Sequence, residues 1–572
     1  MTNKTLPGPA RAIMVLGTSS GAGKSWLATA LCRYYSNQGL KVAPFKAQNM
    51  SNNARVVAGS GGQSVALYLP LPPLGEGRDG GRVDSGATLE KTDRGGPHPH
   101  PPPEGEGAKW CPAPEGRGRS VAPSVLPPGE GRGEGLSDAD NFAALGEIGS
   151  AQYFQALAAR ATPDVRMNPL LLKPEADTHS QVVLLGQVSE VLSAMPWRGR
   201  SQQVWPQIAA ALDALRAEND VVVIEGAGSP AEINLMDSDV VNLRVARHCG
   251  ARCLLVTDID RGGAFAHLYG TWALLPEADR ALIQGFVLNK FRGDAALLAP
   301  APQLLQEKTG VPVVATIPMQ WNHGLPEEDG VFDTRSTGRG AIHTRIAVVA
   351  YPRISNLDEF QPLKNVPGVH LTWARSPADV EGADWIILPG SKATAADLAW
   401  LRAQGLDSAV AQHAARGGRV LGICGGLQML GEALIDTVGV DGNGPGLGLL
   451  PLVTSFEATK TVRHTQARFG DVLGAWGHLS GVAVQGYEIH HGQTAQHPAM
   501  AAKGDVAREL IPGLAWQNPA GNVLGLYLHG LFEDAAVLRA LFGADAPTLE
   551  QVFERMAEGV GQWFAPEALA LP

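Results

Sequence analysis

The fold of this chain is decided by a short stretch near its start, IMVLGTSSGAGKS at residues 13–25. Its apolar residues Ile13–Leu16 predict a strand, the glycines after them predict a tight turn, and a helical pattern continues to about Tyr35. Glycines let backbone N–H groups face phosphate oxygens, and the N-terminus of the following helix adds its positive dipole end. The stretch therefore predicts a phosphate-binding loop after the first strand of an α/β domain.

Three glycines in this loop are expected to allow the close approach to a nucleotide: Gly17, Gly21 and Gly23. Lys24 is placed to reach the β- and γ-phosphates, and the hydroxyl of Ser25 is placed to coordinate Mg²⁺. The strict motif has a glycine where this chain has Thr18, so the first glycine is shifted by one position. An ordinary glycine turn is the alternative, but Gly-Lys-Ser opening a helix favours ATP and Mg²⁺ as ligands.

Three later apolar runs predict further strands of a parallel sheet, at Val221–Ile224, Cys253–Thr257 and Phe286–Leu288. Glu225 follows the first run, at the sheet edge where open α/β proteins bind ligands, and is expected to hold Mg²⁺ directly or through water. Asn289 follows the third run and is expected to pair with the edge of adenine. For both residues the alternative is an exposed loop position without a ligand.

A second site is predicted where the strand Arg419–Ile423 meets Cys424 and then a helix. Small residues on both sides of the cysteine indicate a nucleophile elbow, and the N-terminus of the helix favours a thiolate. The N–H of Gly425 is expected to donate to an oxyanion, with Gly390, after the strand Trp385–Leu388, as the second donor. A buried structural cysteine is the alternative.

A cysteine nucleophile needs a base that is close in space, although it can be far away in sequence. His529 is the preferred candidate because it ends the apolar run Gly525–Leu528, late in the chain. His490 and His491 are the rivals, and one of them could instead contact substrate or a domain interface. The sequence therefore predicts a Cys424–His529 pair.

The composition divides the chain into two domains, since 572 residues exceed what one core normally holds. We expect the first at 10–332, interrupted at about 60–143 by repeated Pro/Gly/Glu/Arg segments that predict disorder. A docking role for this insert is the alternative. A polar linker is expected at 333–342, and the second domain at 343–572, starting with the strand Arg345–Ala350.

The net charge, the cysteine count and the length of the apolar runs argue against several classes of protein. A net charge of −10 disfavours a general nucleic-acid binder, which needs a basic face. Five cysteines are too few, and odd in number, for a disulfide framework, and they fit a reducing cytoplasm. No apolar run approaches the roughly 18 residues that span a bilayer. We therefore expect a cytoplasmic enzyme that binds neither membrane nor nucleic acid; its oligomeric state is not predicted.

Both sites resemble known families. GICGGLQ at 422–428, together with His529, resembles the class I glutamine amidotransferases. This resemblance implies a flavodoxin-like α/β domain that hydrolyses glutamine, with Gln428 at the glutamine-binding site. The first domain is similar to the dethiobiotin-synthetase-like branch of phosphate-loop proteins, which shares the shifted glycine. That resemblance implies a parallel sheet that binds ATP.

The fusion of these domains in this order resembles the corrin amidases, and within them the cobyric acid synthase family. Five stretches carry the resemblance: PFKAQNMS at 44–51, MNPLLLKP at 167–174, EGAGSPAEINL at 225–235, DIDRGG at 258–263 and NKFRGD at 289–294. It implies amidation of the b, d, e and g carboxylates of adenosylcobyrinic acid a,c-diamide in cobalamin biosynthesis, with one ATP and one glutamine for each. It also implies that Lys46, Gln48 and Asn49 lie near the corrinoid or ATP.

Two departures and three rivals accompany this interpretation. In the family, a segment like NNARVV at 52–57 runs almost directly into one like GEIG at 146–149, whereas here the insert intervenes. Many class I amidotransferases have a glutamate two residues after the histidine; here Leu531 stands there, the nearest acid is Glu533, and the third triad member stays open. The sister enzyme, cobyrinic acid a,c-diamide synthase, is disfavoured by KAQNM at 46–50. A partition-type ATPase switch would not need Cys424. An enzyme disabled by the insert is the last rival.

Overall fold

The computed structural model describes residues 10–59, 145–176, 179–321, 323–326, 341–543 and 547–571. These residues belong to one compact unit, which comprises 1–62 and 142–572. The predicted insert at 60–143 lies outside the described residues, as does nearly all of the predicted linker at 333–342. Within the described ranges, no helix combines the length and the apolar character that crossing a membrane requires.

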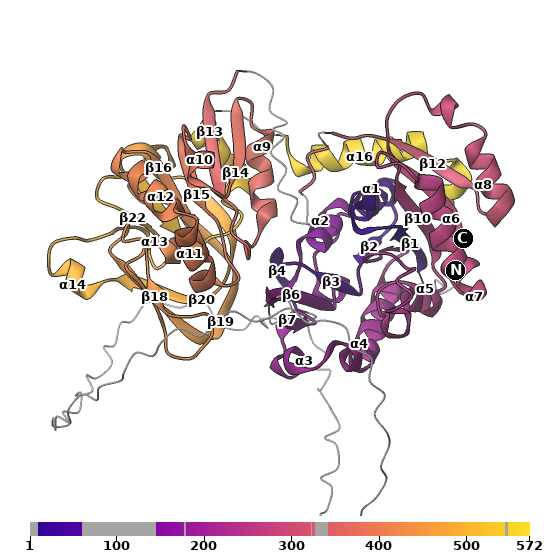
Figure 1. Ribbon diagram of the computed structural model, residues 1–572, viewed down its shortest axis with the longest axis horizontal. Coiled ribbons are helices and arrows are strands. Elements are labelled where there is room, and N and C mark those ends of the chain that lie inside the picture. Colours follow the sequence, from indigo (N-terminus) through magenta and orange to yellow (C-terminus); the bar gives the residue numbers. More distant parts are fainter. Residues whose placement is uncertain are drawn as a thin grey trace, which may run out of the picture. The chain divides into compact units, whose positions relative to one another are not determined.

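The first domain is built on a parallel sheet of six strands in the order β12-β11-β10-β1-β9-β2 (Figure 1). The strands are β1 (Arg11–Gly17), β2 (Val42–Phe45), β9 (Val221–Glu225), β10 (Arg252–Asp258), β11 (Ile283–Phe291) and β12 (Val313–Pro318). Its helices include α1 (Lys24–Asn37), α2 (Ser150–Ala158), α4 (Trp197–Glu218), α5 (Leu243–Cys249), α6 (Ala264–Leu274), α7 (Glu277–Arg280) and α8 (Ala301–Thr309). The predicted parallel α/β sheet is confirmed.

Helices cover both faces of this sheet, which explains its continuous apolar strands. Successive residues of a strand point to opposite faces. Accordingly, Ile13 and Val15 pack in one core cluster with residues of α1 and α2, and Met14 and Leu16 pack in another with residues of α4, α5, α6 and α8. The carboxyl end of β1, where the phosphate loop begins, therefore sits in the middle of a rigid sheet.

Two small sheets complete the first domain. One has the order β3-β6-β7-β8, formed by Gln48–Met50, Leu170–Ala176, His179–Leu184 and Gln187–Val188, with α3 (Glu190–Ala194) after it. The other pairs β4 (Ala54–Ala58) with β5 (Leu145–Gly149) in antiparallel fashion, so that Ala58 faces Leu145. The end of the described range 10–59 and the start of 145–176 thus lie at neighbouring positions. Loop-closure entropy grows only logarithmically with length, so a long segment between them is tolerated.

The second domain has a seven-stranded sheet in the order β14-β13-β15-β16-β23-β22-β21. Its strands are β13 (Thr344–Val349), β14 (Val369–Ala374), β15 (Trp385–Leu388), β16 (Arg419–Ile423), β21 (Arg508–Ile511), β22 (Ala515–Gln517) and β23 (Val523–Leu526). The first five in the sheet are parallel, and their order is the 2-1-3-4-5 arrangement of flavodoxin-like folds. The predicted fold of this domain is confirmed.

Helices and a side sheet surround this core. The helices are α9 (Gln361–Asn365), α10 (Pro377–Val380), α11 (Thr394–Ala403), α12 (Leu406–Ala415), α13 (Gly425–Leu430), α14 (Pro498–Ala501) and α15 (Ala535–Phe542). The side sheet has the order β18-β17-β19-β20, formed by Gly444–Pro445, Ala433–Asp436, Leu452–Arg468 and Ala483–Gln496. Long strands β19 and β20 form an antiparallel ribbon, and β20 brings Ile489 and His490 toward the cysteine.

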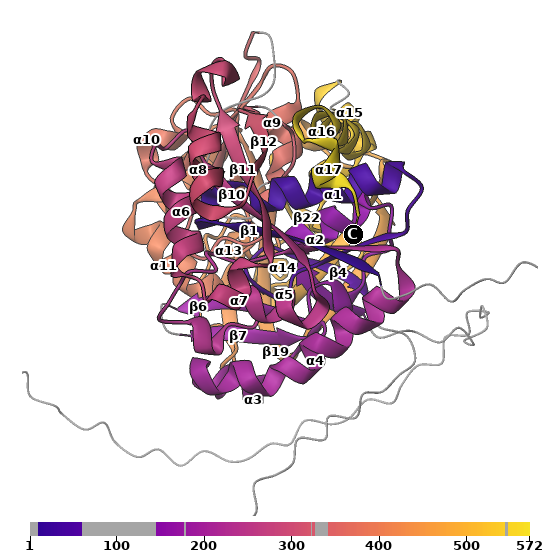
Figure 2. The ribbon, with the colours of Figure 1, turned by 90° about the vertical axis from the view of Figure 1, so that its right-hand side faces the viewer.

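The last helices of the chain, α16 (Leu549–Trp563) and α17 (Pro566–Leu569), pack against α1 of the first domain (Figure 2). Phe553 of α16 belongs to the same core cluster as Leu31 of α1, and the phenol of Tyr35 donates to the carbonyl of Leu569 at 3.0 Å. The second domain predicted from the sequence, at 343–572, includes these residues. In the structure they help to bury the helix that follows the phosphate loop.

Candidate functional site

Lys24 lies at the start of α1, and its side chain folds back against the phosphate loop. Its Nζ donates to the carbonyls of Ser19 at 2.9 Å and Ser20 at 3.2 Å, and also to that of Gly228 at 3.2 Å. A Cβ at Gly17 would lie 3.0 Å from Cδ of Lys24 and 2.9 Å from the Ser19 carbonyl. The shifted glycine therefore has a physical reason, because it makes room for the lysine stem.

Thr18, the residue that replaces the usual glycine, has its own contact. Its hydroxyl donates to the hydroxyl of Thr257 on β10 at 3.0 Å, and its N–H donates to the carbonyl of Val256 at 2.9 Å. The side chain thus fastens the start of the loop to the neighbouring strand. A threonine at this position stabilises the loop where the strict motif has only a glycine.

Asn289 lies within β11, so the prediction that the strand ends at Leu288 is wrong; pairing with β10 and β12 continues the strand to Phe291. Its Nδ2 donates to the carbonyl of Ala22 at 2.9 Å. A Cβ at Gly23, where φ is +96°, would lie 2.0 Å from this nitrogen. Asn289 therefore holds the loop at its glycines. Its predicted pairing with adenine stays a prediction.

Gly21 lies on the outer side of the same loop, within reach of two cations. Lys290 donates to the carbonyl of Gly21 at 2.9 Å, and Arg261 Nη2 would lie 3.2 Å from a Cβ at this glycine. Lys290 also pairs with Asp258 at 3.1 Å. Positive groups around an N–H-lined loop suit a phosphate-bearing ligand.

Glu225 is fully buried at the carboxyl end of β9, so the alternative of an exposed loop acid is wrong. Its carboxylate accepts hydrogen bonds from Ser25 Oγ at 2.8 Å, Lys46 Nζ at 2.9 Å and Gln155 Nε2 at 2.5 Å. Burial alone would raise the pKa of Glu225, but the Lys46 ammonium and these hydrogen bonds hold it below its usual value. The carboxylate is therefore charged.

Ser25 and Glu225 together fit a magnesium ion. Mg²⁺ prefers oxygen ligands and commonly uses one or two protein groups, with substrate phosphates and water completing its shell. Among the described residues, no group of three or more His, Cys, Asp and Glu side chains is arranged to hold a metal. An ion here would be held by the hydroxyl, the carboxylate and a nucleotide rather than by a protein cage.

Two cavities meet at the phosphate loop, where both are lined by Ser20, Lys24 and Ser25. One, of about 410 Å³, is lined by residues that include Asn289 and Trp321. The other, of about 390 Å³, lies on the Glu225 side and is lined by residues that include Lys46, Gln48, Asn49 and Met50. The arrangement allows a nucleotide on one side of the loop and a phosphoryl acceptor on the other.

Cys424 occupies the turn between β16 and α13 with φ 52° and ψ −106°, a strained backbone conformation for a non-glycine residue. Glycines next to it are required by close packing: a Cβ at Gly426 would lie 1.8 Å from the Leu388 carbonyl, and one at Gly422 2.7 Å from Gly426. The thiol lies 3.7 Å from the carbonyl of Ile489. This is the geometry of a nucleophile elbow.

His529 lies three residues beyond β23 rather than at its end, and it forms a β-bridge with Tyr487 on β20. Its Nδ1 lies 3.3 Å from both carboxylate oxygens of Glu359, which also accepts the N–H of Gly530 at 3.1 Å. Burial would lower the pKa of His529, but Glu359 and Cys424 raise it to about 10. The imidazole is therefore held protonated between a carboxylate and the cysteine.

Glu359 is a residue that sequence reasoning missed. It is completely buried in the short helical turn Leu357–Phe360, 170 positions before the histidine. The available signal is the acidic pair Asp358-Glu359 soon after β13, at the edge of a parallel sheet where ligands bind. Glu533, the nearest acid in sequence, pairs instead with Arg55 at 2.5 Å.

The other predicted residues of this site are also gathered around Cys424. A Cβ at Gly390 would lie 2.8 Å from Cε1 of His529, and one at Gly425 would lie 2.7 Å from the N of Ser391. Gln428 is buried, and its Oε1 accepts from the Thr394 hydroxyl at 3.1 Å. Cys424, Gln428 and His529 line a cavity of about 60 Å³ with residues that include Asn52 and Lys173.

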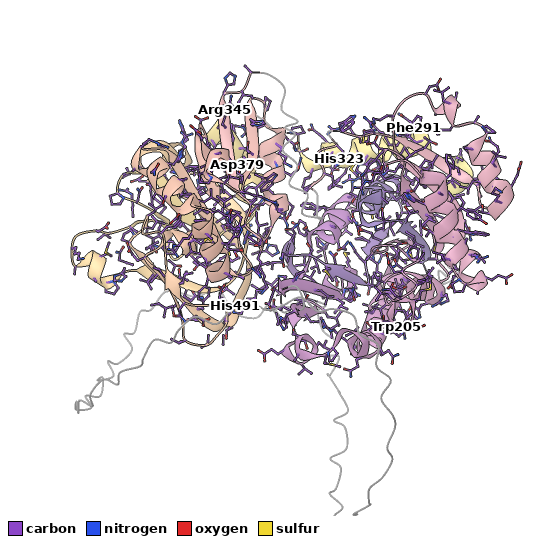
Figure 3. The ribbon with its side chains drawn as sticks, viewed as in Figure 1. Trp205, Phe291, His323, Arg345, Asp379 and His491 are labelled. Carbon is purple, nitrogen blue, oxygen red and sulfur yellow. The ribbon has the colours of Figure 1, made fainter. Side chains whose placement is uncertain are left out.

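The rival histidines line this cavity too, but they have other partners. His490 contacts the Gly492 carbonyl at 2.8 Å and Glu488 at 3.2 Å, and its ring stacks on Tyr527. His491, labelled in Figure 3, contacts the carbonyl of Glu457 at 3.0 Å, and burial together with Lys460 lowers its pKa to about 4. The geometry therefore favours His529 as the partner of Cys424.

A cysteine beside a histidine in one domain and a nucleotide loop flanked by two cavities in the other fit a glutamine amidotransferase joined to a nucleotide-binding domain. Residues 345–537 match the model of the CobB/CobQ-like glutamine amidotransferase domain, and residues 13–329 match that of the CobQ/CobB/MinD/ParA nucleotide binding domain. The chain is 75% identical to a cobyric acid synthase of Acidovorax sp. (strain JS42), over 99% of both chains. It belongs to the cobyric acid synthase family.

Other relatives agree. The chain is 69% identical to a cobyric acid synthase of Paracidovorax citrulli (strain AAC00-1), over 97% of this chain and 98% of the relative. It is 56% identical to a cobyric acid synthase of Leptothrix cholodnii, over 98% of this chain and 97% of the relative. PurLQS from Thermotoga maritima, a solved structure, matches 38% of this chain and 98% of its own at 16% identity and a TM-score of 0.27, too low to add to the assignment. The chain is thus an amide-forming enzyme that uses glutamine, and the non-synthetic ATPase alternative is not supported.

Proposed function

We propose that this enzyme converts the b, d, e and g carboxylates of adenosylcobyrinic acid a,c-diamide into carboxamides, with one ATP and one glutamine consumed for each. The proposal is supported by the presence of two candidate sites in one chain of this family. One site has Cys424 beside a protonated histidine, and the other has a phosphate loop open to two cavities.

Glutamine is hydrolysed at Cys424. The Cys424 sulfur attacks the carboxamide carbon as the thiolate, its proton already on His529, and the N–H groups of Gly425 and Gly390 stabilise the negative oxygen of the tetrahedral intermediate. His529 donates its proton to the departing nitrogen, so ammonia leaves and a thioester remains. Water then attacks the thioester, with His529 as the base, and glutamate is released. Gln428 lines the cavity in which the glutamine side chain lies.

Glu359 acts in this site as the positioning carboxylate. It accepts from Nδ1 of His529, which leaves Nε2 for the proton exchange with sulfur and substrate, and it stabilises the imidazolium. It performs the role that a glutamate two residues after the histidine has in other class I amidotransferases, where this chain has Leu531. The third triad member is thus supplied from the turn after β13.

At the other site the chain activates a carboxylate. The acceptor carboxylate enters the cavity lined by Lys46, Gln48 and Asn49, and attacks the γ-phosphorus of ATP; ADP leaves and an acyl phosphate forms. Ammonia then attacks the acyl carbon, and phosphate leaves with the bonding electrons. Lys24 and the loop N–H groups at Gly17, Gly21 and Gly23 stabilise the phosphoryl charge.

Mg²⁺, held by Ser25 and Glu225, would neutralise phosphate charge in this site. Lys46 pairs with Glu225 in the structure, so it is placed to exchange that partner for the incoming carboxylate. Asn289 supports nucleotide binding by holding the loop, and we keep its contact with adenine as part of the proposal. We place the reaction in the cytoplasm, in keeping with buried, unpaired thiols at Cys32, Cys249, Cys253 and Cys424.

The domain division is also a proposal. We propose that 10–326 together with 547–571 form the synthetase part, and 341–543 the glutaminase part. Mass spectrometry of the corrinoid, after incubation with glutamine, ATP and Mg²⁺, tests the function. Four successive conversions of carboxyl to carboxamide are expected. Glutamate release without any change of this corrinoid, or amidation only of the a and c groups of cobyrinic acid, would contradict the proposal.

A further inference from the structure

One segment of the first domain, residues 46–55, reaches both active sites. At its start, Lys46, Gln48 and Asn49 line the acceptor-side cavity at the phosphate loop. Further along, Asn52 lines the cavity that contains Cys424. At its end is Arg55, which is 1% exposed although it carries a charge. Because this segment contacts both cavities, it is placed to couple binding at the phosphate-loop site to the geometry of the Cys424 site.

Arg55 is held in the interior by two carboxylates. Its Nη2 pairs with Asp358 and, at 2.5 Å, with Oε1 of Glu533. Burial would lower the pKa of Arg55, but Asp358 and Glu533 raise it well above the ordinary value. A buried cation is strongly disfavoured unless it is paired, so each partner is fixed in place as long as Arg55 is present.

Asp358 belongs to the turn that also supplies Glu359, and the first domain holds this turn at three successive residues. Nδ2 of Asn356 donates to the carbonyl of Ala54 at 2.9 Å, and the N–H of Leu357 donates to Oδ1 of Asn53 at 2.9 Å. Asp358 then pairs with Arg55. The next residue, Glu359, contacts His529, so the position of the carboxylate depends on residues 53–55.

Tyr487 provides a second connection between Arg55 and the histidine. The guanidinium of Arg55 lies over its ring, 5.1 Å from the centroid. The other neighbour of the ring is His529, with ring centroids 5.4 Å apart and planes 20° from parallel. The phenol oxygen accepts from Nδ2 of Asn356 at 2.6 Å. Arg55 therefore reaches His529 through the turn 356–359 and through an aromatic stack.

We propose that Arg55 is a positioning residue for His529, and that through it segment 46–55 makes glutamine hydrolysis depend on the acceptor cavity. The inference rests on the proposed role of His529 as the partner of Cys424. An acceptor that binds against Lys46, Gln48 and Asn49 fixes the segment, and the fixed segment holds the turn 356–359 in place. Glu359 then keeps the imidazole aligned with the sulfur.

The variant Arg55→Gln tests the proposal in the full-length protein. We expect kcat for glutamate release to fall about 10- to 100-fold, the size of effect that a displacement of about 1 Å produces, with KM for glutamine little changed. Amidation supplied with ammonium salt instead of glutamine should be retained. Adding adenosylcobyrinic acid a,c-diamide with MgATP should raise glutamate release in the parent enzyme and should raise it less in the variant.

Arg33→Gln is the matched control. Arg33 is also fully buried in the first domain, pairs with Glu550 at 2.5 Å and Glu554 at 3.0 Å, and lies over the ring of Phe553. It should lose stability in the same way and keep kcat for glutamate release. Equal losses of kcat in the two variants, or an unchanged kcat in Arg55→Gln, would overturn the proposal, as would a parent enzyme whose glutamate release ignores the acceptor.

Tyr487→Phe keeps the test decisive if Arg55→Gln does not fold. It preserves the ring between Arg55 and His529 and removes one of the two acceptors of Asn356 Nδ2, so kcat for glutamate release should fall several-fold with KM little changed. A kcat equal to that of the parent would contradict the inference. If the proposed role of Cys424 is wrong, Cys424→Ala will still release glutamate. That result separates failure of the proposed function from failure of this inference.

Discussion

The two active sites of this chain are built in different ways. The phosphate loop is local: Gly17 through Ser25 are contiguous and lead from β1 into α1, and a few residues from neighbouring strands fasten the loop. The glutaminase site is assembled from residues far apart in sequence, Glu359, Gly390, Cys424 and His529, which the sheet of the second domain brings together. A local site depends mainly on its own residues, whereas an assembled site depends on every element that positions its members. Substitutions can test this contrast.

The largest effect is expected from Cys424→Ala. It should abolish glutamine-dependent amidation, with a loss of glutamate release on the order of 10⁴-fold or more, as for other enzymes that lose a nucleophile. Ammonium-dependent amidation should stay near the parent rate, because the phosphate loop is a separate site. Both activities would be measured on one preparation, and loss of both would contradict the division of labour.

The converse change is Lys24→Met in the phosphate loop. It removes the ammonium expected to contact the transferring phosphoryl group, and ATP-dependent amidation should fall about 10²- to 10³-fold with either nitrogen source. Glutamate release in the absence of acceptor should be unaffected. A comparable fall in that release would show that the local loop also controls the assembled site.

Glu359→Gln tests the assembled site through pH. The carboxylate raises the pKa of His529, which is about 10 in the parent, so an uncharged amide should lower it. The imidazolium is then lost at a lower pH, and the alkaline limb of the kcat/KM profile for glutamate release, which reports the free enzyme, should move down from near pH 10. We expect kcat itself to fall roughly 10²-fold. An unmoved alkaline limb would exclude Glu359 as the partner of the histidine.

The smallest effect on catalysis is expected from Phe553→Ala in α16. Phe553 is fully buried in the core cluster that includes α1, and truncation of such a side chain costs about 3–5 kcal/mol of unfolding free energy. Denaturant unfolding should show this loss, while glutamate release at 25 °C stays close to the parent value. A selective loss of glutaminase activity would mean that α16 supports the second domain.

The sequence reveals the local site more completely than the assembled one. Gly17 to Ser25 are contiguous, so their spacing alone predicts the strand, the turn and the helix. Cys424 and His529 are recognisable because each has a local motif. Glu359 has none, since its role depends on the turn 356–359 being brought to His529 by the sheet and held by Arg55.

The same reasoning explains the other differences. No local pattern can name α1 as the partner of α16, because that contact joins residues near the two ends of the chain. Asn289 lies in a strand because pairing with β10 and β12 extends beyond the apolar run that marks it. In each case a long-range contact, rather than local propensity, decides the outcome.

The cooperation of the two sites is tested most directly by supplying glutamine labelled with ¹⁵N in its amide, together with ATP, Mg²⁺ and adenosylcobyrinic acid a,c-diamide, in a buffer that contains unlabelled ammonium. The mass of the corrinoid product should show ¹⁵N in the b, d, e and g carboxamides for the parent enzyme, and unlabelled nitrogen in all four for Cys424→Ala. Unlabelled carboxamides from the parent enzyme, or labelled ones from Cys424→Ala, would contradict transfer of nitrogen from Cys424 to the acceptor.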